Sequence, residues 1–353
     1  MHILILAQTP PPIHGAALIN KAVLDALSSH PGTTTKHINI SKSNSIYDMQ
    51  KSALQKSLKA MLLMISTCLS IIKNRKKITY INTAPGGIAS IRDFVFLTLA
   101  SFCSRNVFAH FHGQIPKNSI FLNSSRFLFK TNVTFIFLDE SLIPEQFKIT
   151  RKKTEILSNF APNEDAYKTI ERAGAKIKTV GFLANMLPAK GIDTFLATCA
   201  SELRAGSNFS VHIAGGWTAK YEEEQYTKWI TDNADISDRF THYGAVNNLQ
   251  KSVFFNKVDI FYYPTKNDAF PLVLLEAMAS GSAILTTDIG AIKNIIADGD
   301  LICSTNEDSK KLRLLLDNPS ILVEKQKNLR DRYYSKYSHA HFEKNLYLIL
   351  GVK

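Results

Sequence analysis

The most constraining feature of this sequence is a regular alternation of short apolar runs with helix-length segments. Runs that are apolar on both faces are typical of parallel strands covered by helices. Two successive series of this kind predict an α/β protein with two doubly wound, Rossmann-like domains. The expected strands are His2–Ala7, Thr35–Ile40, Ile78–Thr83, Val107–His112, Thr134–Leu138 and Glu155–Ser158, then Ile177–Leu183, Val211–Ala214, Phe240–Tyr243, Asp259–Tyr263, Ala283–Thr286 and Leu301–Cys303.

The length fits this organisation, because 353 residues suffice for two domains of ordinary size. We expect domains over residues 1–165 and 166–335, with the linker near 160–174, where Ala161-Pro162-Asn163-Glu164-Asp165 interrupts the alternation. Helical segments follow the last strand. The final one, within 336–353, can cross back and pack on the first domain.

The charge is strongly positive and unevenly distributed. The chain has 42 Lys and Arg against 30 Asp and Glu, a net +12, and residues 1–150 hold 16 basic but only 6 acidic side chains. Such an excess suits nucleic acid, an anionic membrane or a phosphorylated substrate. The basic residues are not interleaved with aromatic ones as a stacking surface for nucleic acid requires, so we expect no nucleic-acid partner.

One apolar stretch, residues 60–72, is too short to span a bilayer, which needs about 20 residues. It is followed by Lys73, Arg75, Lys76 and Lys77. Two interpretations remain open. The stretch is either a buried helix with solvated ends, or its ends and the surrounding basic surface touch anionic lipid.

The cysteines and the N-terminus indicate the cellular compartment in which the protein works. Cys68, Cys103, Cys199 and Cys303 stand singly in apolar stretches, without a C-x-x-C pair or a histidine cluster at metal-binding spacing, so we expect four buried thiols in a reducing compartment and no metal. The chain starts without the basic and apolar regions of a signal peptide. We therefore expect a cytoplasmic protein, and the basic charge of the first half places it peripherally at the inner face of the cytoplasmic membrane.

The strongest motif lies near residue 270. Asp268 and Glu276 stand eight residues apart across a predicted loop-to-helix junction, and Pro271 suits the first helical turn. The amides of Leu272 and Val273 would then be free at a positive helix end that suits a diphosphate. The two acids would accept hydrogen bonds from sugar hydroxyls. The alternative is an ordinary capped helix with one buried Glu.

These residues resemble a known family. The segment 268–292 closely resembles the acidic-x7-acidic region of the retaining glycosyltransferases of family 4, which have a GT-B fold. Residues 181–193 resemble the first strand–loop–helix of that family's nucleotide domain, and 213–217 and 243–246 resemble its next two strand ends. Pro11–Ala16 and His110–Gly113 lie where the family marks its first domain. The resemblance implies two Rossmann-like domains that face a central cleft.

The resemblance also implies roles for single residues. Glu276 would hold the ribose hydroxyls, while Asp268 and His112 would face the donor sugar. Gly15 would let a loop of the first domain approach the phosphates, because a side chain there would obstruct it. Lys190, with the backbone of Phe270, Pro271, Leu272 and Val273, would bind the diphosphate, and the base would lie near Tyr243, Gly244 and Val246.

Two positions depart from the family's pattern. Asp268 stands where the family usually has Glu, so the sugar would lie closer or be contacted through water. Asn185 stands where the family usually has Arg, which removes one cation from the diphosphate site. Asn185 is kept only as a neutral hydrogen-bond donor.

The resemblance predicts a metal-independent, retaining glycosyltransferase without a cofactor, the nucleotide-sugar being its substrate. We expect a UDP-sugar as donor, with a GDP-sugar as the alternative. The resemblance implies that the first domain binds the acceptor, and the basic charge of that domain favours a polyprenyl-diphosphate-linked glycan. The resemblance also implies bacterial O-antigen or capsule synthesis as the setting. A nucleotide-sugar epimerase of related fold and a non-catalytic bilobal nucleotide- or sugar-binding protein are the alternatives.

Overall fold

The computed structural model describes residues 1–11, 13–41, 53–122, 131–168, 177–304 and 306–352. The chain forms two compact units, the first built from Met1–Asn159 with Ala340–Lys353 and the second from Phe160–His339. The sequence boundaries at 165/166 and 335/336 fall a few residues from these. Pro12 and the part of the expected linker over 169–174 lie outside the described residues.

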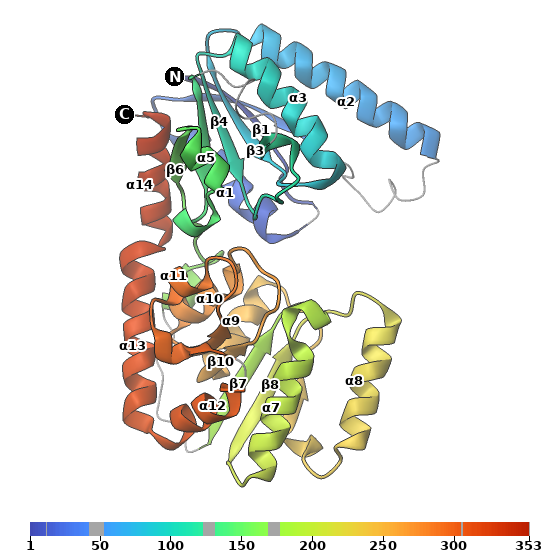
Figure 1. Cartoon of the computed structure of the whole chain (residues 1–353), viewed down its shortest axis with the longest axis vertical. Helices are drawn as coiled ribbons and strands as arrows, with labels where there is room; N and C mark the ends of the chain where they lie inside the picture. The colour runs from blue at the N-terminus through green and yellow to red at the C-terminus, as the bar shows by residue number, and fades with distance from the viewer. Residues whose placement is uncertain (12, 42–52, 123–130, 169–176, 305, 353) are drawn as a thin grey trace. The chain divides into compact units, whose positions relative to one another are not determined.

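Unit 1 contains a six-stranded sheet in the order β2-β1-β3-β4-β5-β6, and each described neighbouring pair is parallel (Figure 1). Apolar side chains of the central strands, including Leu6, Ile81, Phe111 and Phe135, are fully buried. The elements are β1 (His2–Ala7), α1 (Gly15–Ser29), β2 (Thr34–Asn39), α2 (Ala53–Lys73), β3 (Ile78–Thr83), α3 (Gly87–Cys103), β4 (Asn106–Phe111), β5 (Val133–Phe137), α5 (Glu145–Ile149) and β6 (Lys153–Ile156).

The last helix, α14 (His339–Leu350), begins at the end of unit 2 and continues into unit 1. The Tyr347 hydroxyl donates to the carbonyl of Ala26 in α1 at 3.0 Å, and its ring lies 4.9 Å from that of His30. The expectation that the C-terminal helix packs back on the first domain is therefore confirmed.

Unit 2 contains a second parallel sheet of six strands, in the order β12-β11-β10-β7-β8-β9. The strand order reverses between β7 and β10. The elements are α6 (Asp165–Lys168), β7 (Lys178–Leu183), α7 (Ile192–Arg204), β8 (Phe209–Ala214), α8 (Lys220–Asp232), β9 (Phe240–His242), α9 (Asn248–Lys257), β10 (Ile260–Tyr263), α10 (Leu272–Ser280), β11 (Ala283–Thr287), α11 (Ile292–Ile296), β12 (Ile302–Cys303), α12 (Asp308–Asp317) and α13 (Pro319–Lys336).

All twelve expected strands are present, with ends within two residues of the predicted ones. The sequence predicts these strands because helices cover both faces of each central strand, so the run of apolar residues coincides with the strand. The doubly wound α/β architecture is confirmed. A central cleft between the domains stays a prediction.

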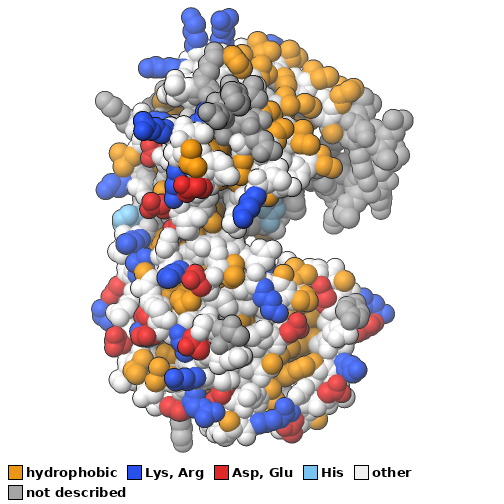
Figure 2. Space-filling view, in the orientation of Figure 1, with side chains coloured by type: hydrophobic (Ala, Val, Ile, Leu, Met, Phe, Trp, Pro, Cys, Tyr) orange, Lys and Arg blue, Asp and Glu red, His pale blue; other side chains and the backbone are white. Residues whose placement is uncertain are grey.

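Helix α2 is longer than the apolar stretch 60–72, and its outer face is not buried. Ile71 packs in the core of unit 1 with Met64 and Cys68 beside it. Cys68 and Cys103 are only partly buried, so the expectation of buried thiols is right for Cys199 and Cys303 alone. Five apolar side chains on the other side of the helix are between 49% and 57% exposed, so the interpretation as a buried helix is wrong. They are Met61, Leu62, Ile65, Leu69 and Ile72. Figure 2 shows hydrophobic side chains gathered over α2 and α3.

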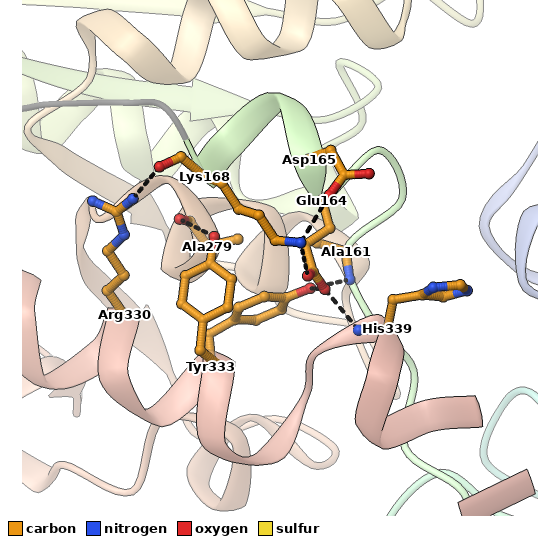
Figure 3. A network of polar contacts seen from close by, with 9 residues as sticks. Ala161, Glu164, Asp165, Lys168, Ala279, Arg330, Tyr333 and His339 are labelled. Atoms are coloured by element: carbon orange, nitrogen blue, oxygen red, sulfur yellow. Dashed lines mark hydrogen bonds and ion pairs between the residues drawn. The ribbon is translucent and has the colours of Figure 1, made fainter. Parts of the chain in front are cut away.

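Within unit 2, a buried carboxylate connects the first residues of the unit with the last (Figure 3). Glu164 is 8% exposed, and its Oε2 accepts from the Tyr333 hydroxyl at 2.8 Å and from the amide of His339 at 2.6 Å. The same hydroxyl accepts from the amide of Ala161 at 3.1 Å. Both points at which the chain passes between the units are thus held by one hydrogen-bonded cluster, because Ala161 and His339 lie at those points.

Candidate active site

The candidate site lies at the carboxyl ends of β7 and β10, where the strand order of the unit 2 sheet reverses. Open α/β sheets bind ligands at such a switch point, because the loops from the two strands diverge there. The two loops are joined by a bond from the amide of Lys266 to the carbonyl of Ala189, at 3.0 Å. Gly191 makes this approach possible, since its φ is +85° and a Cβ would lie 2.0 Å from the Pro264 carbonyl oxygen.

Asp268 lies in the loop after β10, with its side chain fixed from two sides. Its Oδ2 accepts from the Lys190 ammonium at 2.6 Å and from the Tyr263 hydroxyl at 3.0 Å. Burial, together with the charge of Asp268, raises the pKa of Tyr263, so this hydroxyl stays protonated and donates. The structure thus brings Lys190 and Asp268 together, and 28% and 19% of their side chains remain accessible.

The loop that carries Asp268 is also supported by the segment after β11. The amide of Ala291 donates to the carbonyl of Ala269 at 2.9 Å. Gly290 has a φ of +59°, and a Cβ there would lie 2.3 Å from the carbonyl oxygen of Asp268. The backbone around Asp268 is therefore held by close contacts that leave no room for a larger residue at position 290.

Helix α10 starts one residue later than expected. Pro271 is the N-cap, with a ψ of 117°, and not the first helical residue; Leu272 and Val273 occupy the first two helical positions. The amides of the first turn have no acceptor within the helix, so both remain suited to bind an anion. The Phe270 ring is buried and lies 6.3 Å from the Tyr337 ring, so Phe270 offers its backbone rather than its side chain.

Glu276 lies inside α10, 1% exposed, and Lys251 of α9 is paired with it. The Lys251 ammonium lies 2.9 Å from one carboxylate oxygen and 3.1 Å from the other. Burial raises the pKa of Glu276, and the ion pair opposes that shift. The Tyr167 hydroxyl is buried without a hydrogen-bond partner among the described residues, and burial followed by the charge of Glu276 raises its pKa.

Lys251 is the residue that our sequence reasoning missed. A Glu in an otherwise apolar helix implies a cationic or hydrogen-bonding partner, because an unpaired buried charge is costly. The sequence does not say which lysine provides it, since Lys251 and Glu276 are far apart along the chain and meet only when α9 packs beside α10.

The remaining unit 2 candidates lie at the ends of neighbouring strands. Asn185 is exposed after β7. The Tyr243 hydroxyl is hydrogen-bonded to Nδ1 of His212 at 3.2 Å, which directs this side chain along the sheet. The carbonyl of Gly244 accepts from the amide of Gly215 at 2.8 Å, so the loops after β8 and β9 are joined. Val246 is partly buried directly before α9, the helix that carries Lys251.

Two expected site residues belong to unit 1. Gly15 is the first residue of α1, whose N-cap His14 accepts from the amide of Ala17 at 3.3 Å. His112 follows β4, and its Nε2 lies 3.1 Å from Oδ1 of Asn20. The Asn20 amide nitrogen donates to the carbonyl of Gln8 at 2.9 Å, which fixes its oxygen toward His112.

This orientation determines the protonation of His112. Because Asn20 Oδ1 can only accept, Nε2 carries the proton and Nδ1 is the unprotonated nitrogen. Nδ1 is buried, with no hydrogen-bond partner in the described part of the chain. Burial and the nearby His14 lower the pKa of His112 to about 3, so the ring is neutral at physiological pH. The His110 ring lies 4.1 Å away, and its Nδ1 is bonded to the Tyr80 hydroxyl at 2.6 Å.

The four basic residues proposed to face a membrane lie together and exposed in unit 1. Lys73 ends α2, and Arg75, Lys76 and Lys77 form the turn before β3. None of the helices described in the structure is long and apolar enough to cross a bilayer. Among the described residues, no three His, Cys, Asp or Glu side chains form a group that could hold a metal ion.

Comparison with solved structures defines the class of fold. A glycosyltransferase from Rickettsia africae superposes with a TM-score of 0.73 at 12% identity, over 100% of this chain and 99% of that one. Anabaena HepE, solved in complex with UDP, superposes with a TM-score of 0.72 at 14% identity over 100% of both chains. The protein therefore has the GT-B fold.

Comparison of sequences shows which family of proteins unit 2 matches. Residues 163–336 match the family model of the glycosyl transferases group 1, which covers nearly all of unit 2 and every candidate site residue in it. The lipopolysaccharide core biosynthesis mannosyltransferase LpcC of Rhizobium leguminosarum is 27% identical over 146 residues, 41% of this chain and 41% of the relative. The aligned segment thus spans less than half the length of that relative.

Proposed function

We propose that this protein is a retaining glycosyltransferase that transfers a sugar from a nucleotide-diphosphate donor. The observation that carries the proposal is the arrangement at the β7–β10 switch point. There the Lys190–Asp268 pair lies in the loops that flank the N-terminus of α10, and the Glu276–Lys251 pair follows within that helix. The match of this unit to the glycosyl transferases group 1 supports it.

Each group has a role suited to its chemistry. The free amides of Leu272 and Val273 and the positive end of α10 would stabilise the departing diphosphate, since negative charge develops there in the transition state. Asp268, through the oxygen not bonded to Lys190, would accept a hydroxyl of the donor sugar. Glu276 would hold the ribose hydroxyls. No metal ion is needed in this scheme, because cationic and amide groups of the protein compensate the charge.

Lys251 is a candidate for the cation that is missing at position 185. Its ammonium is held at Glu276, where the ribose hydroxyls of a bound nucleotide would lie, beside the diphosphate at the start of α10. We propose that Lys251 adds the positive charge that Arg would have supplied in place of Asn185. Binding of the nucleotide to Lys251 would cost little additional free energy, because its ammonium is largely desolvated and oriented by Glu276 before the nucleotide arrives.

The donor is proposed to be a UDP-sugar, with a GDP-sugar as the alternative. The neighbour HepE was solved with UDP, and LpcC is named a mannosyltransferase. The decisive experiment is calorimetry of UDP and GDP binding to the wild type and to Glu276→Gln. We expect at least a tenfold loss of affinity in this variant and none in the exposed control Asp288→Asn. Undiminished affinity in Glu276→Gln would refute the site.

Measuring donor consumption with and without an acceptor then distinguishes a glycosyltransferase from an epimerase and from a binding protein. A transferase consumes the donor only when an acceptor is present, apart from slow hydrolysis. A nucleotide-sugar epimerase would convert the donor without an acceptor. A non-catalytic binding protein would do neither, although both nucleotide and sugar would bind.

The acceptor is proposed to be a polyprenyl-diphosphate-linked glycan of O-antigen or capsule type at the inner face of the cytoplasmic membrane. Unit 1 holds 21 basic and 8 acidic residues, and unit 2 holds 21 and 22, so the excess charge lies wholly in unit 1. The exposed apolar side chains of α2 extend from Met61 to Ile72, and the basic residues Lys73, Arg75, Lys76 and Lys77 follow directly. A surface that combines both features suits an anionic membrane.

Vesicle binding tests the membrane part alone. Replacing the four basic residues with Gln should abolish co-sedimentation with vesicles that contain anionic lipid, and salt should weaken wild-type binding. The matched control replaces four lysines of unit 2, Lys220, Lys228, Lys293 and Lys327, and should bind as the wild type does. Equal binding by both variants would remove the basic cluster from the membrane surface.

A further inference from the structure

A cavity lies in unit 2, between α7 and α8. Its volume is about 490 Å³, within the ordinary range of small-molecule pockets. None of the candidate residues of the nucleotide site lines it. Met186, Ile192 and Leu196 form part of its apolar wall, at the N-terminal end of α7 and in the loop before it.

Aromatic rings form the opposite wall. The chain has two tryptophans, Trp217 and Trp229, and both line this cavity together with Tyr226. The rings of Trp217 and Tyr226 lie 5.4 Å apart, and Trp229 packs 5.2 Å from Phe240. Tyr226 and Trp229 connect α8 to β9, through the rings of His242 at 5.3 Å and Phe240 at 5.2 Å, and no described residue of α8 is fully buried.

Four polar side chains around the aromatic wall have no side-chain partner in the described part of the chain. Asp193, Gln225, Lys228 and Asp232 line the cavity, and none of them makes a hydrogen bond or ion pair with another described residue. A third carboxylate, Glu222, accepts from the Thr218 hydroxyl at 2.7 Å. The lining therefore combines aromatic faces with unused hydrogen-bonding groups and carries more negative than positive charge.

We propose that this cavity is a carbohydrate-binding site for a neutral oligosaccharide. A pyranose ring has an apolar C–H face that packs on an aromatic ring, and its hydroxyls donate to carboxylates and amides. A purely apolar ligand would desolvate the carboxylates without replacing their hydrogen bonds. A nucleotide or an anionic lipid would be repelled by the three carboxylates, which outnumber Lys228.

The site is separate from the nucleotide site and does not depend on the proposed activity. A glycan held there would keep a growing chain, or a neighbouring polysaccharide, close to the enzyme and would raise its effective concentration. Glu276→Gln should leave this binding unchanged. Failure of the carbohydrate site and failure of the nucleotide site are thus observed in different experiments.

The two tryptophans allow binding of a sugar in the cavity to be measured by NMR. The protein is labelled with 5-fluorotryptophan, so its ¹⁹F NMR spectrum contains one resonance from each ring, assigned through Trp217→Phe. Maltotriose, cellotriose and mannotriose are added separately, with uridine as the comparison. We expect saturable shifts of both resonances with at least one trisaccharide at millimolar concentration.

Variants establish where the sugar binds. The double variant Asp193→Asn and Asp232→Asn keeps the shape of the cavity and should weaken binding at least fivefold. The control Glu224→Gln, on an exposed side chain of α8 that does not line the cavity, should bind as the wild type does. No shift with any trisaccharide, equal shifts with uridine, or unchanged affinity in the double variant would each overturn the proposal.

Discussion

Replacement of Lys251 with Met tests the buried pair at the centre of the candidate site. Met has a similar length and apolar stem but no charge, so the change removes the ammonium while it largely preserves packing. Glu276, which is 1% exposed, would then lose the ammonium that lies 2.9 Å from its carboxylate. Removing one partner of a buried ion pair typically costs 3–5 kcal/mol, and about 3 kcal/mol applies here because the Lys251 side chain is 22% exposed.

The expected loss depends on pH. Burial already raises the pKa of Glu276, and without Lys251 this pKa rises further. Because the pKa is higher in the folded than in the unfolded state, the penalty is present above the folded pKa and disappears as the pH falls and the carboxyl takes up a proton. The deficit of Lys251→Met relative to the wild type should therefore be larger at pH 8 than at pH 5.

Thermal and chemical unfolding measure the effect. For a unit of this size, about 3 kcal/mol corresponds to a decrease of roughly 6–12 °C in the Tm of unit 2 at pH 8. The double variant Lys251→Met with Glu276→Gln should recover most of the loss, since no charge is then left unpaired. A loss below about 1 kcal/mol that is equal at pH 5 and pH 8 would refute the reasoning.

Three further predictions concern other parts of the fold. Because burial lowers the pKa of His112 to about 3, stability is lost as the pH falls below about 6.5, by at most about 2 kcal/mol at pH 5 from this group; urea unfolding of His112→Gln should show a smaller loss between pH 7 and pH 5. Gly290→Ala should displace the Asp268 loop and reduce UDP affinity in calorimetry, whereas Gly299→Ala, where a Cβ meets nothing within 4 Å, should not. Glu164→Gln should lower the unfolding free energy by about 1–3 kcal/mol, and the exposed neighbour change Asp165→Asn by less than about 0.5 kcal/mol; equal losses from the two would contradict the role given to the Glu164 cluster.

Much of the fold was predictable because it depends on local patterns. A parallel strand buried on both faces is a continuous apolar run, so strands such as Ile78–Thr83 were found with their correct ends. The exposed face of α2 was not predictable in this way. Its apolar residues look the same in sequence whether a protein core or solvent lies beside them, and only the packing of α3 and the sheet distinguishes the two.

The candidate site shows the same division. The sequence by itself determined that Asp268, Glu276 and a helix N-terminus lie close together, because they are neighbours along one strand–loop–helix segment. Only the tertiary structure decided their partners, Lys190 on Asp268 and Lys251 on Glu276. These pairs join segments many residues apart, and their geometry follows from the order in which β7 and β10 meet and from the packing of α9 beside α10. The cavity between α7 and α8 is likewise a product of packing, since no local pattern brings Trp217 and Trp229 to the same wall.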